Sequence, residues 1–183
     1  MSDIAPIVIV GPPGAGKTTV GALLAEALGV TFFDNDASIE AAAGKPISEI
    51  FIDEGEPVFR RLEAESIARA LVECWGVISL GGGAVLDEST RALLRSHRVL
   101  YLRVGLSDAV RRVGIAQSRP VLTLNPRAAL RELLAKRTPM YEEVATVTID
   151  TDGLTPEEVA AKAATELARL GPSQLDQVSE ANK

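Results

Sequence analysis

Residues 7–18 read IVIVGPPGAGKT, and this stretch decides the fold. The run from Ile4 to Val10 is short and almost wholly apolar, as is typical of a strand buried on both faces of a sheet. Gly11–Thr18 then matches the pattern G-x-x-x-x-G-K-[ST], a loop whose backbone N–H groups cradle phosphates. Apolar residues at helical spacing follow as far as Gly29, a residue suited to the end of a helix. This order of strand, loop and helix predicts an α/β domain that binds a nucleotide.

Four more strands are expected along the chain, with helical segments between them. We place these strands at Val30–Phe33, Gly76–Leu80, Arg98–Val104 and Val144–Asp150. An amphipathic stripe over residues 64–72 and a capping box at Thr155-Pro156-Glu157-Glu158 indicate two of the helices. Strands that alternate with helices predict a parallel sheet covered by helices on both faces, and thus three layers. In such sheets ligands bind beyond the C-terminal ends of the strands, so the informative residues follow each strand directly.

Composition and charge exclude several classes of protein. The 183 residues are 46% hydrophobic, and no apolar run is long enough to cross a membrane. A net charge of −6 and an aromatic content of 4% argue against a binder of nucleic acid or of membrane surfaces. The single Cys74 excludes an internal disulfide, and Met1-Ser2-Asp3 lacks the start of a secretory signal, so we expect a cytoplasmic protein. The length suits one domain, placed at residues 1–171, followed by a disordered tail at 172–183.

The phosphate-binding loop has the residue types that its chemistry needs. Gly14 and Gly16 let the backbone curl so that successive N–H groups point at phosphate oxygens. Lys17 supplies a positive charge to the β- and γ-phosphates, and the Thr18 hydroxyl is placed to bind Mg²⁺. GTPases, ATPases and small-molecule kinases share this loop. The N-K-x-D string usual in guanine-binding proteins does not occur in this sequence.

A carboxylate for the metal is expected at the end of the second strand, because the strand Val77–Leu80 ends in glycines instead of an acid. Asp34-Asn35-Asp36 is the obvious source, and in an extended segment its two acids would share one face. One acid would support the metal, while the other would accept a proton from an attacking hydroxyl. The alternative is that these acids only cap the helix expected at Ser38–Ala43.

Three successive glycines and two arginines indicate a second binding site. Gly81-Gly82-Gly83 ends a strand, where three glycines make sense if the backbone approaches a ligand and donates N–H groups to it. Arg60 and Arg137 each lie on an otherwise apolar helix face, so each guanidinium needs an anionic partner. A substrate carboxylate would suit, since arginine binds carboxylates bidentately. The alternatives are snorkelling to solvent or an internal salt bridge for each arginine.

Residues 114–126 are expected to form a loop, because they contain Gly114, Pro120, Asn125 and Pro126. The loop is long enough to be a lid, from which Arg119 would reach over the phosphates and neutralise transition-state charge. A solvated loop arginine is the alternative.

The motifs together resemble those of the shikimate kinase family, from about Ile7 to Leu170. The residues that carry the resemblance are GPPGAGKTT, FFDND, FRRLE, SLGGGAV, SRPVL and LLAKRTPMY, in this order along the chain. The resemblance implies a P-loop kinase fold with a five-stranded parallel sheet, a mobile lid at about 114–126 and a monomer. It also implies a substrate-binding segment at about 34–62.

The resemblance also assigns roles to residues. It implies ATP binding by the loop and its surroundings, namely Gly14, Ala15, Gly16, Lys17, Thr18, Thr19, Arg112, Arg119 and Pro156, with Arg112 and Pro156 flanking the adenine. Asp34 would hold Mg²⁺ through water, together with Thr18. Shikimate would be bound by Asp36, Arg60, Gly82, Gly83 and Arg137, the arginines chiefly by its carboxylate. Lys17, Asp36 and Arg119 would be the catalytic residues, with Asp36 as candidate base.

The expected reaction is therefore transfer of the ATP γ-phosphoryl group to the 3-hydroxyl of shikimate, giving shikimate 3-phosphate and ADP. Another small-acid kinase, such as a gluconate kinase, also needs a phosphate loop and a carboxylate site. A nucleotide-binding regulator without turnover is the alternative from a different class. It would bind a nucleotide and release no ADP in response to shikimate.

Overall fold

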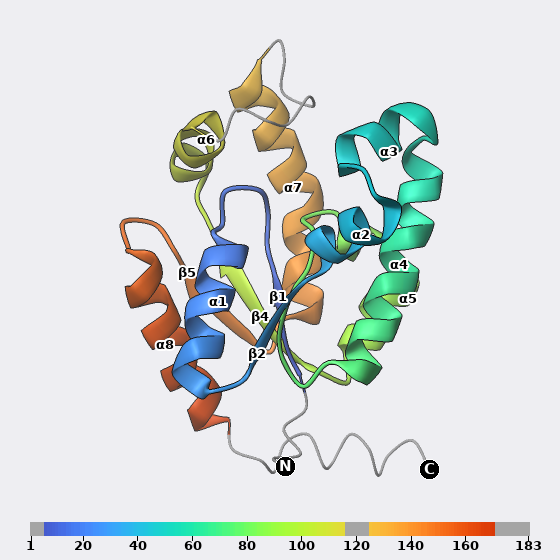
Figure 1. The fold of residues 1–183 in the computed structure, drawn as a ribbon. Helices are drawn as coiled ribbons and strands as arrows, with labels where there is room; N and C mark the ends of the chain where they lie inside the picture. The colour runs from blue at the N-terminus through green and yellow to red at the C-terminus, as the bar shows by residue number, and fades with distance from the viewer. Residues whose placement is uncertain (1–5, 116–124, 171–183) are drawn as a thin grey trace.

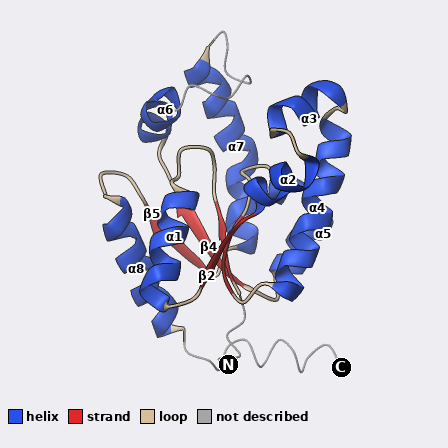
Figure 2. Ribbon diagram, in the orientation of Figure 1, coloured by secondary structure: helices blue, strands red, loops and turns tan. Residues whose placement is uncertain are grey.

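The computed structural model describes residues 6–115 and 125–170, which form a parallel sheet between two layers of helices (Figures 1 and 2). The strands are β1 (Ile7–Val10), β2 (Thr31–Asp34), β3 (Gly76–Ser79), β4 (Arg98–Arg103) and β5 (Val147–Asp150). The helices are α1 (Lys17–Leu28), α2 (Asn35–Ala43), α3 (Ile47–Asp53), α4 (Glu56–Glu73), α5 (Glu88–Leu94), α6 (Leu106–Ile115), α7 (Pro126–Val144) and α8 (Pro156–Arg169), with a 3₁₀ turn, η1, at Ala84–Leu86. The predicted fold class is confirmed.

The strands lie in the order β2-β3-β1-β4-β5, and every pair is parallel. The central strand β1 is buried on both faces, as its apolar sequence predicted. Ile7 and Ile9 belong to the core under α1 and α8, whereas Val8 and Val10 belong to the core under α4, α5 and α7. Because β1 is central, the loop that follows it emerges in the middle of the C-terminal edge of the sheet.

A third, smaller core lies between α2, α3 and the start of α4. Ile39, Ile50 and Phe59 are its buried members, and the Phe51 and Phe59 rings lie 4.7 Å apart. Figure 1 shows these helices beside the C-terminal edge of the sheet, on the opposite side from α6. The chain thus builds a separate support for the residues that follow β2.

The predicted bounds of α2 and β5 and the predicted buried face of α4 differ from the structure. Asp36 does not lie in an extended segment, because α2 begins at Asn35 and the Asp34 carboxylate caps it by accepting from the Ala37 N–H. The strand expected from Val144 begins at Val147, since α7 continues to Val144 and buries it beside Tyr141. The buried face of α4 runs through Glu63, Ser66, Ile67 and Ala70, so Ala68 and Val72 of the predicted stripe are exposed.

Other expectations concern the lid, the tail and the helix ends. Gly114 belongs to α6 and Pro126 is the first residue of α7, so neither end of the segment 114–126 is a loop residue as predicted. Residues 116–124, with Arg119, lie outside the described residues, as does the tail 172–183. The capping box at Thr155 and the left-handed Gly29 at the end of α1 are both present. In the described part of the chain, no helix is long and apolar enough to cross a membrane.

Candidate functional site

The loop between β1 and α1 has the backbone conformation that phosphate binding requires. Gly14 and Gly16 have φ angles of 81° and 86°, a left-handed conformation that side chains disfavour. Helix α1 begins at Lys17, so its unpaired N–H groups and its positive dipole end face the loop. The Lys17 ammonium donates to the Pro12 carbonyl across the loop at 3.2 Å. The cradle is therefore formed by the backbone of this loop and the start of α1.

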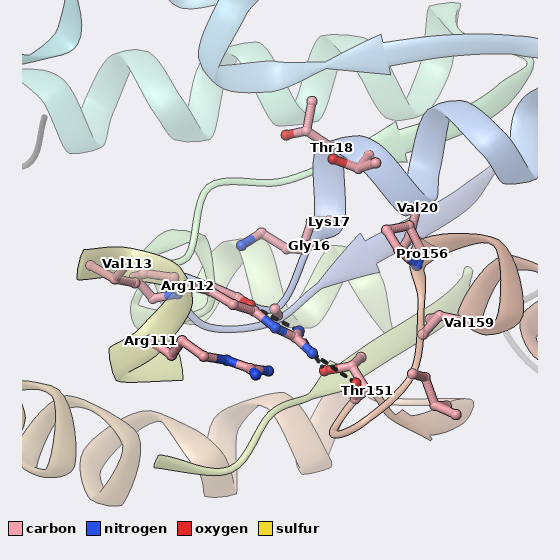
Figure 3. Close-up of a pocket in the computed structure, with 15 residues that line it drawn as sticks. Gly16, Lys17, Thr18, Val20, Arg111, Arg112, Val113, Thr151, Pro156 and Val159 are labelled. Atoms are coloured by element: carbon pink, nitrogen blue, oxygen red, sulfur yellow. Dashed lines mark hydrogen bonds between the residues drawn. The ribbon is translucent and has the colours of Figure 1, made fainter. Parts of the chain in front are cut away.

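A cavity of about 530 Å³ lies over this loop (Figure 3). It gathers eight of the nine residues predicted to bind the nucleotide: Gly14, Ala15, Gly16, Lys17, Thr18, Thr19, Arg112 and Pro156. Arg119, the ninth, lies outside the described residues. The far wall comes from α6 and from the loop between β5 and α8, so segments far apart in sequence enclose one pocket.

Arg112 ties these segments together. Its guanidinium donates to the Gly14 carbonyl at 3.2 Å and to the carbonyl and hydroxyl of Thr151 at 2.8 and 3.1 Å, as Figure 3 shows for Thr151. Asp108 pairs with Arg112 at 3.4 Å and accepts from the Gly153 N–H at 3.3 Å. Thr151 is buried, and its role was missed because nothing in the sequence sets it apart. These bonds hold α6 against the phosphate loop.

Thr18 and Asp34 meet at the mouth of the cradle. The Thr18 hydroxyl donates to one Asp34 carboxylate oxygen at 2.8 Å, while the other oxygen of Asp34 caps α2. A hydroxyl and a carboxylate at this distance supply oxygen ligands of the kind that Mg²⁺ takes, directly or through its waters. The described residues contain no cluster of three or more His, Cys, Asp or Glu side chains that could hold a metal by itself. The donor set therefore fits a metal shared with a nucleotide's phosphates.

The glycine run after β3, Gly81–Gly83, lies where the phosphate loop and the second site meet. A Cβ atom at Gly81 would lie 2.6 Å from an Asp36 carboxylate oxygen and 2.8 Å from one of Glu63. At Gly82 it would lie 3.2 Å from the Pro13 ring, and at Gly83 it would overlap the Arg60 guanidinium. Each glycine thus makes room for a different part of the site. The sequence predicted a single reason for all three glycines, the approach of a ligand. In the structure each glycine has its own neighbour, which a side chain at that position would meet.

Arg60 is held by two carboxylates of its own helix. It pairs with Glu63 at 2.6 Å and with Glu56 at 3.1 Å, and its guanidinium also lies 5.2 Å from the centre of the Phe59 ring. Burial works to lower the pKa of Arg60, but Glu63 and Glu56 outweigh it, so this pKa lies above the ordinary value. The internal salt bridge that was the alternative for Arg60 is therefore present.

Glu63 is another site residue that sequence reasoning missed. Its side chain is 4% exposed, and burial raises its pKa, an effect that Arg60 opposes and Asp36 reinforces. The available signal was its spacing, because Glu63 follows Arg60 by three residues and so shares its helix face. A buried acid beside an arginine means that the positive charge offered to a ligand here is partly balanced in advance.

Arg137 reaches the glycine run from the other side. Its guanidinium donates to the Gly82 carbonyl at 2.9 Å, and the Tyr141 hydroxyl, one helical turn later, donates to the same oxygen at 2.6 Å. Asp36, Arg60, Gly82, Gly83 and Arg137, predicted from different segments, are therefore gathered around one short loop. That these residues bind an acceptor stays a prediction.

A phosphate cradle lies beside a second site that contains two arginines and the carboxylates of Asp36 and Glu63. This arrangement defines a P-loop kinase that phosphorylates a small anionic molecule. The family model described as shikimate kinase matches residues 13–168 of the chain. The chain belongs to the shikimate kinase family.

Individual relatives agree with this assignment. The chain is 60% identical over 166 residues to a shikimate kinase of Salinispora arenicola, covering 90% of this chain and 99% of the relative. The structure of a shikimate kinase from Acinetobacter baumannii in complex with shikimate superposes with a TM-score of 0.89 at 36% identity, covering 93% of this chain and 97% of that one. A gluconokinase from Sinorhizobium meliloti is less similar, with a TM-score of 0.63 at 25% identity, covering 94% and 97% of the two chains.

Proposed function

We propose that the chain transfers the γ-phosphoryl group of ATP to the 3-hydroxyl of shikimate, giving shikimate 3-phosphate and ADP. The main support from the site is the position of the glycine run. Gly82 lies beside the phosphate loop, whereas Gly81 and Gly83 lie beside the proposed acceptor residues Asp36 and Arg60. Donor and acceptor would therefore be held next to each other, which lowers the barrier by removing the entropy cost of bringing them together.

On the nucleotide side, the phosphate loop would hold the β- and γ-phosphates through its N–H groups and Lys17. Arg112 and Pro156 line the same cavity and would flank the adenine. We propose Mg²⁺ as the divalent metal, held by Thr18 directly and by Asp34 through water, since these oxygens lie 2.8 Å apart. When bound with ATP, the metal would neutralise charge on the transferred group. Arg119 would add charge from the lid.

On the acceptor side, Arg60 and Arg137 would bind the carboxylate of shikimate. Both guanidiniums are half-buried and lie beside the glycine run, so a planar carboxylate between them would meet several N–H donors. Asp36 lies in the first turn of α2, two residues beyond the proposed metal ligand Asp34. From there it would orient the attacking hydroxyl and accept its proton.

ADP release with a panel of acceptors tests this proposal. Shikimate, gluconate and nucleoside monophosphates are each supplied with Mg²⁺ and ATP, and the Lys17→Met variant serves as the inactive control. We expect turnover with shikimate alone. Turnover with gluconate instead would assign the chain to a different small-acid kinase activity, and nucleotide binding without any turnover would make it a regulator.

We further propose that the enzyme is a cytoplasmic monomer. The resemblance to the family supports the monomer, and the single Cys74, which rules out an internal disulfide, suits a reducing compartment. Light scattering of the purified protein during gel filtration would give a mass close to that of one 19.3 kDa chain. A mass of two chains would contradict it.

A further inference from the structure

Two side chains of α7 converge on one carbonyl oxygen, that of Gly82. Arg137 and Tyr141 are four residues apart and therefore share a helix face. The Arg137 guanidinium donates at 2.9 Å and the Tyr141 hydroxyl at 2.6 Å, so both lone pairs of the oxygen are engaged. Such double anchoring of a backbone carbonyl in a glycine run restricts the segment of the chain that is otherwise the freest to move.

The two donors differ in how firmly they are themselves held. Tyr141 is fully buried, and its ring stacks on Tyr101 with the ring centres 5.1 Å apart. A tyrosine held in this way has two side-chain torsions, both fixed by packing, so its hydroxyl has one position. Arg137 is half-buried on a longer and more flexible side chain. The tyrosine is therefore the rigid member of the pair.

Fixing the Gly82 carbonyl also fixes the N–H of the next residue. The peptide bond between Gly82 and Gly83 is trans, as are all the described peptide bonds, so its C=O and N–H point in opposite directions. Because the carbonyl points at α7, the Gly83 N–H points away from α7. Gly83 also packs closely against the Arg60 guanidinium. By helping to hold the Gly82 carbonyl, the Tyr141 hydroxyl therefore restricts the direction of the Gly83 N–H and keeps in place the oxygen to which Arg137 donates.

We propose that Tyr141 is a positioning residue for the acceptor: by holding the Gly82 carbonyl, it orients the Gly83 N–H and the Arg137 guanidinium toward the substrate's polar groups. This inference rests on the proposed function, since it takes the glycine run as the acceptor site. Tyr141 itself touches no substrate in this scheme. It acts through groups that do.

The matched pair Tyr141→Phe and Tyr101→Phe tests this role. Both changes remove one hydroxyl from the same stacked pair of rings, but only the Tyr141 hydroxyl reaches Gly82. We expect Tyr141→Phe to raise the KM and Kd for shikimate by roughly 3- to 10-fold, the factor that corresponds to one lost hydrogen bond. The KM for ATP should stay unchanged and kcat should stay within about twofold, because the nucleotide cavity and Asp36 are untouched. Tyr101→Phe should leave all three values near those of the wild type.

Two results would overturn the proposal. The first is that Tyr141→Phe and Tyr101→Phe bind shikimate with the same Kd. The second is that Tyr141→Phe raises the KM for shikimate and the KM for ATP together and also lowers the Tm, because this pattern indicates a general structural role. Should the wild type use another acid of the acceptor panel, the proposed function is wrong, and the same comparison with that acid still decides the role of Tyr141.

A second measurement does not depend on the Tyr141→Phe variant. The chain has only two tyrosines, so incorporation of 3-fluorotyrosine gives resonances from Tyr101 and Tyr141 alone. Tyr101→Phe assigns them. Addition of shikimate should shift the ¹⁹F resonance of Tyr141 more than that of Tyr101. An unmoved Tyr141 resonance in the presence of saturating shikimate would contradict the proposal.

Discussion

The proposed nucleotide site and the proposed acceptor site of this enzyme are built in different ways. The phosphate cradle comes from one contiguous stretch, Gly11–Thr18, and its donors are mainly backbone N–H groups. The proposed acceptor site takes side chains from α2, α4 and α7, which lie around Gly81–Gly83. A backbone site needs only the right local conformation, whereas a side-chain site needs several elements packed in register.

Charge is also handled differently in the two sites. The chain carries a net charge of −6, yet both proposed ligands are anions, so each site must be locally positive. The cradle relies on Lys17 and on oriented peptide groups. The acceptor site uses full arginine charges, and it partly balances Arg60 with the buried Glu63. We infer that the acceptor site is the more sensitive of the two to changes in buried charge.

The largest effect is expected at Asp36, the proposed base of the acceptor site. Asp36→Asn should lower kcat by about 10²- to 10⁴-fold, because the amide cannot accept the proton of the hydroxyl. ATP affinity, measured by calorimetry, should stay nearly unchanged. The exposed Asp53, which pairs with Lys45 on the surface, offers a control in Asp53→Asn with normal turnover. Near-normal turnover of the Asp36 variant would exclude its role as the base.

Glu63→Gln tests the balancing of charge in the acceptor site. The change leaves Arg60 without its most buried partner, so the free energy of unfolding at neutral pH should fall by about 1–3 kcal/mol. Urea denaturation measures it. Glu65→Gln is the control, because Glu65 lies on the exposed side of the same helix. Equal stabilities of the two variants would show that the buried carboxylate is not required.

The contribution of Glu63 to stability is expected to depend on pH, and the same variant tests this. The folded-state pKa of Glu63 is raised above 4.5, so the folded protein binds this proton more tightly than the unfolded chain does. Its contribution to stability is complete below pH 4.5 and is lost as the pH rises through the raised pKa. The stability that Glu63→Gln loses relative to the wild type should therefore become smaller as the pH rises over this window. A difference that does not vary with pH there would contradict the raised pKa.

Gly83→Ala tests whether the acceptor site can be damaged alone. The new Cβ would overlap the Arg60 guanidinium, the far end of a flexible side chain, so Arg60 should move while the fold stays intact. We expect the KM for shikimate to rise by about 10-fold and the KM for ATP to stay unchanged. A parallel rise in both KM values would mean that the two sites are not separable in this way.

The smallest effect is expected at the edge of the nucleotide site. Thr155 caps α8 next to Pro156, so Thr155→Ala should cost about 1 kcal/mol of stability and leave the KM for shikimate unchanged. Thr165 is also exposed, but its hydroxyl bonds within α8, to the Ala161 carbonyl. Thr165→Ala should therefore change stability by only a few tenths of a kcal/mol. Thermal unfolding distinguishes the two variants. Equal losses of stability would mean that the Thr155 cap stabilises α8 no more than the Thr165 hydroxyl does.

Much of the fold could be predicted because its signals are local. The apolar β1, the loop after it and the capping box of α8 each lie within a few neighbouring residues, and all were found. The predictions failed where tertiary packing moved a boundary. Helix α7 extends through Val144 because that side chain is buried with Tyr141, and α2 begins one residue after β2 because Asp34 caps it.

For the candidate site, the sequence indicated the arginines and glycines but not their partners. Arg60 and Arg137 stood out because a charge on an apolar helix face is unusual. Glu63, Tyr141 and Thr151 did not stand out, since a buried acid, a tyrosine and a threonine fit many places in a fold. Their importance depends on what lies opposite them, which no spacing along the chain specifies.

The sequence by itself determined the phosphate loop, the alternation of strands and helices and, through the order of its motifs, the family. These features rest on backbone conformation and on periodicity, which nearby residues control. Only the tertiary structure decided that three adjacent glycines receive Asp36 with Glu63, the phosphate loop and Arg60, in that order. It also placed two donors of α7 on one carbonyl. These two hydrogen bonds join residues 55 and 59 positions apart, so they exist only after the sheet has brought its strand ends together.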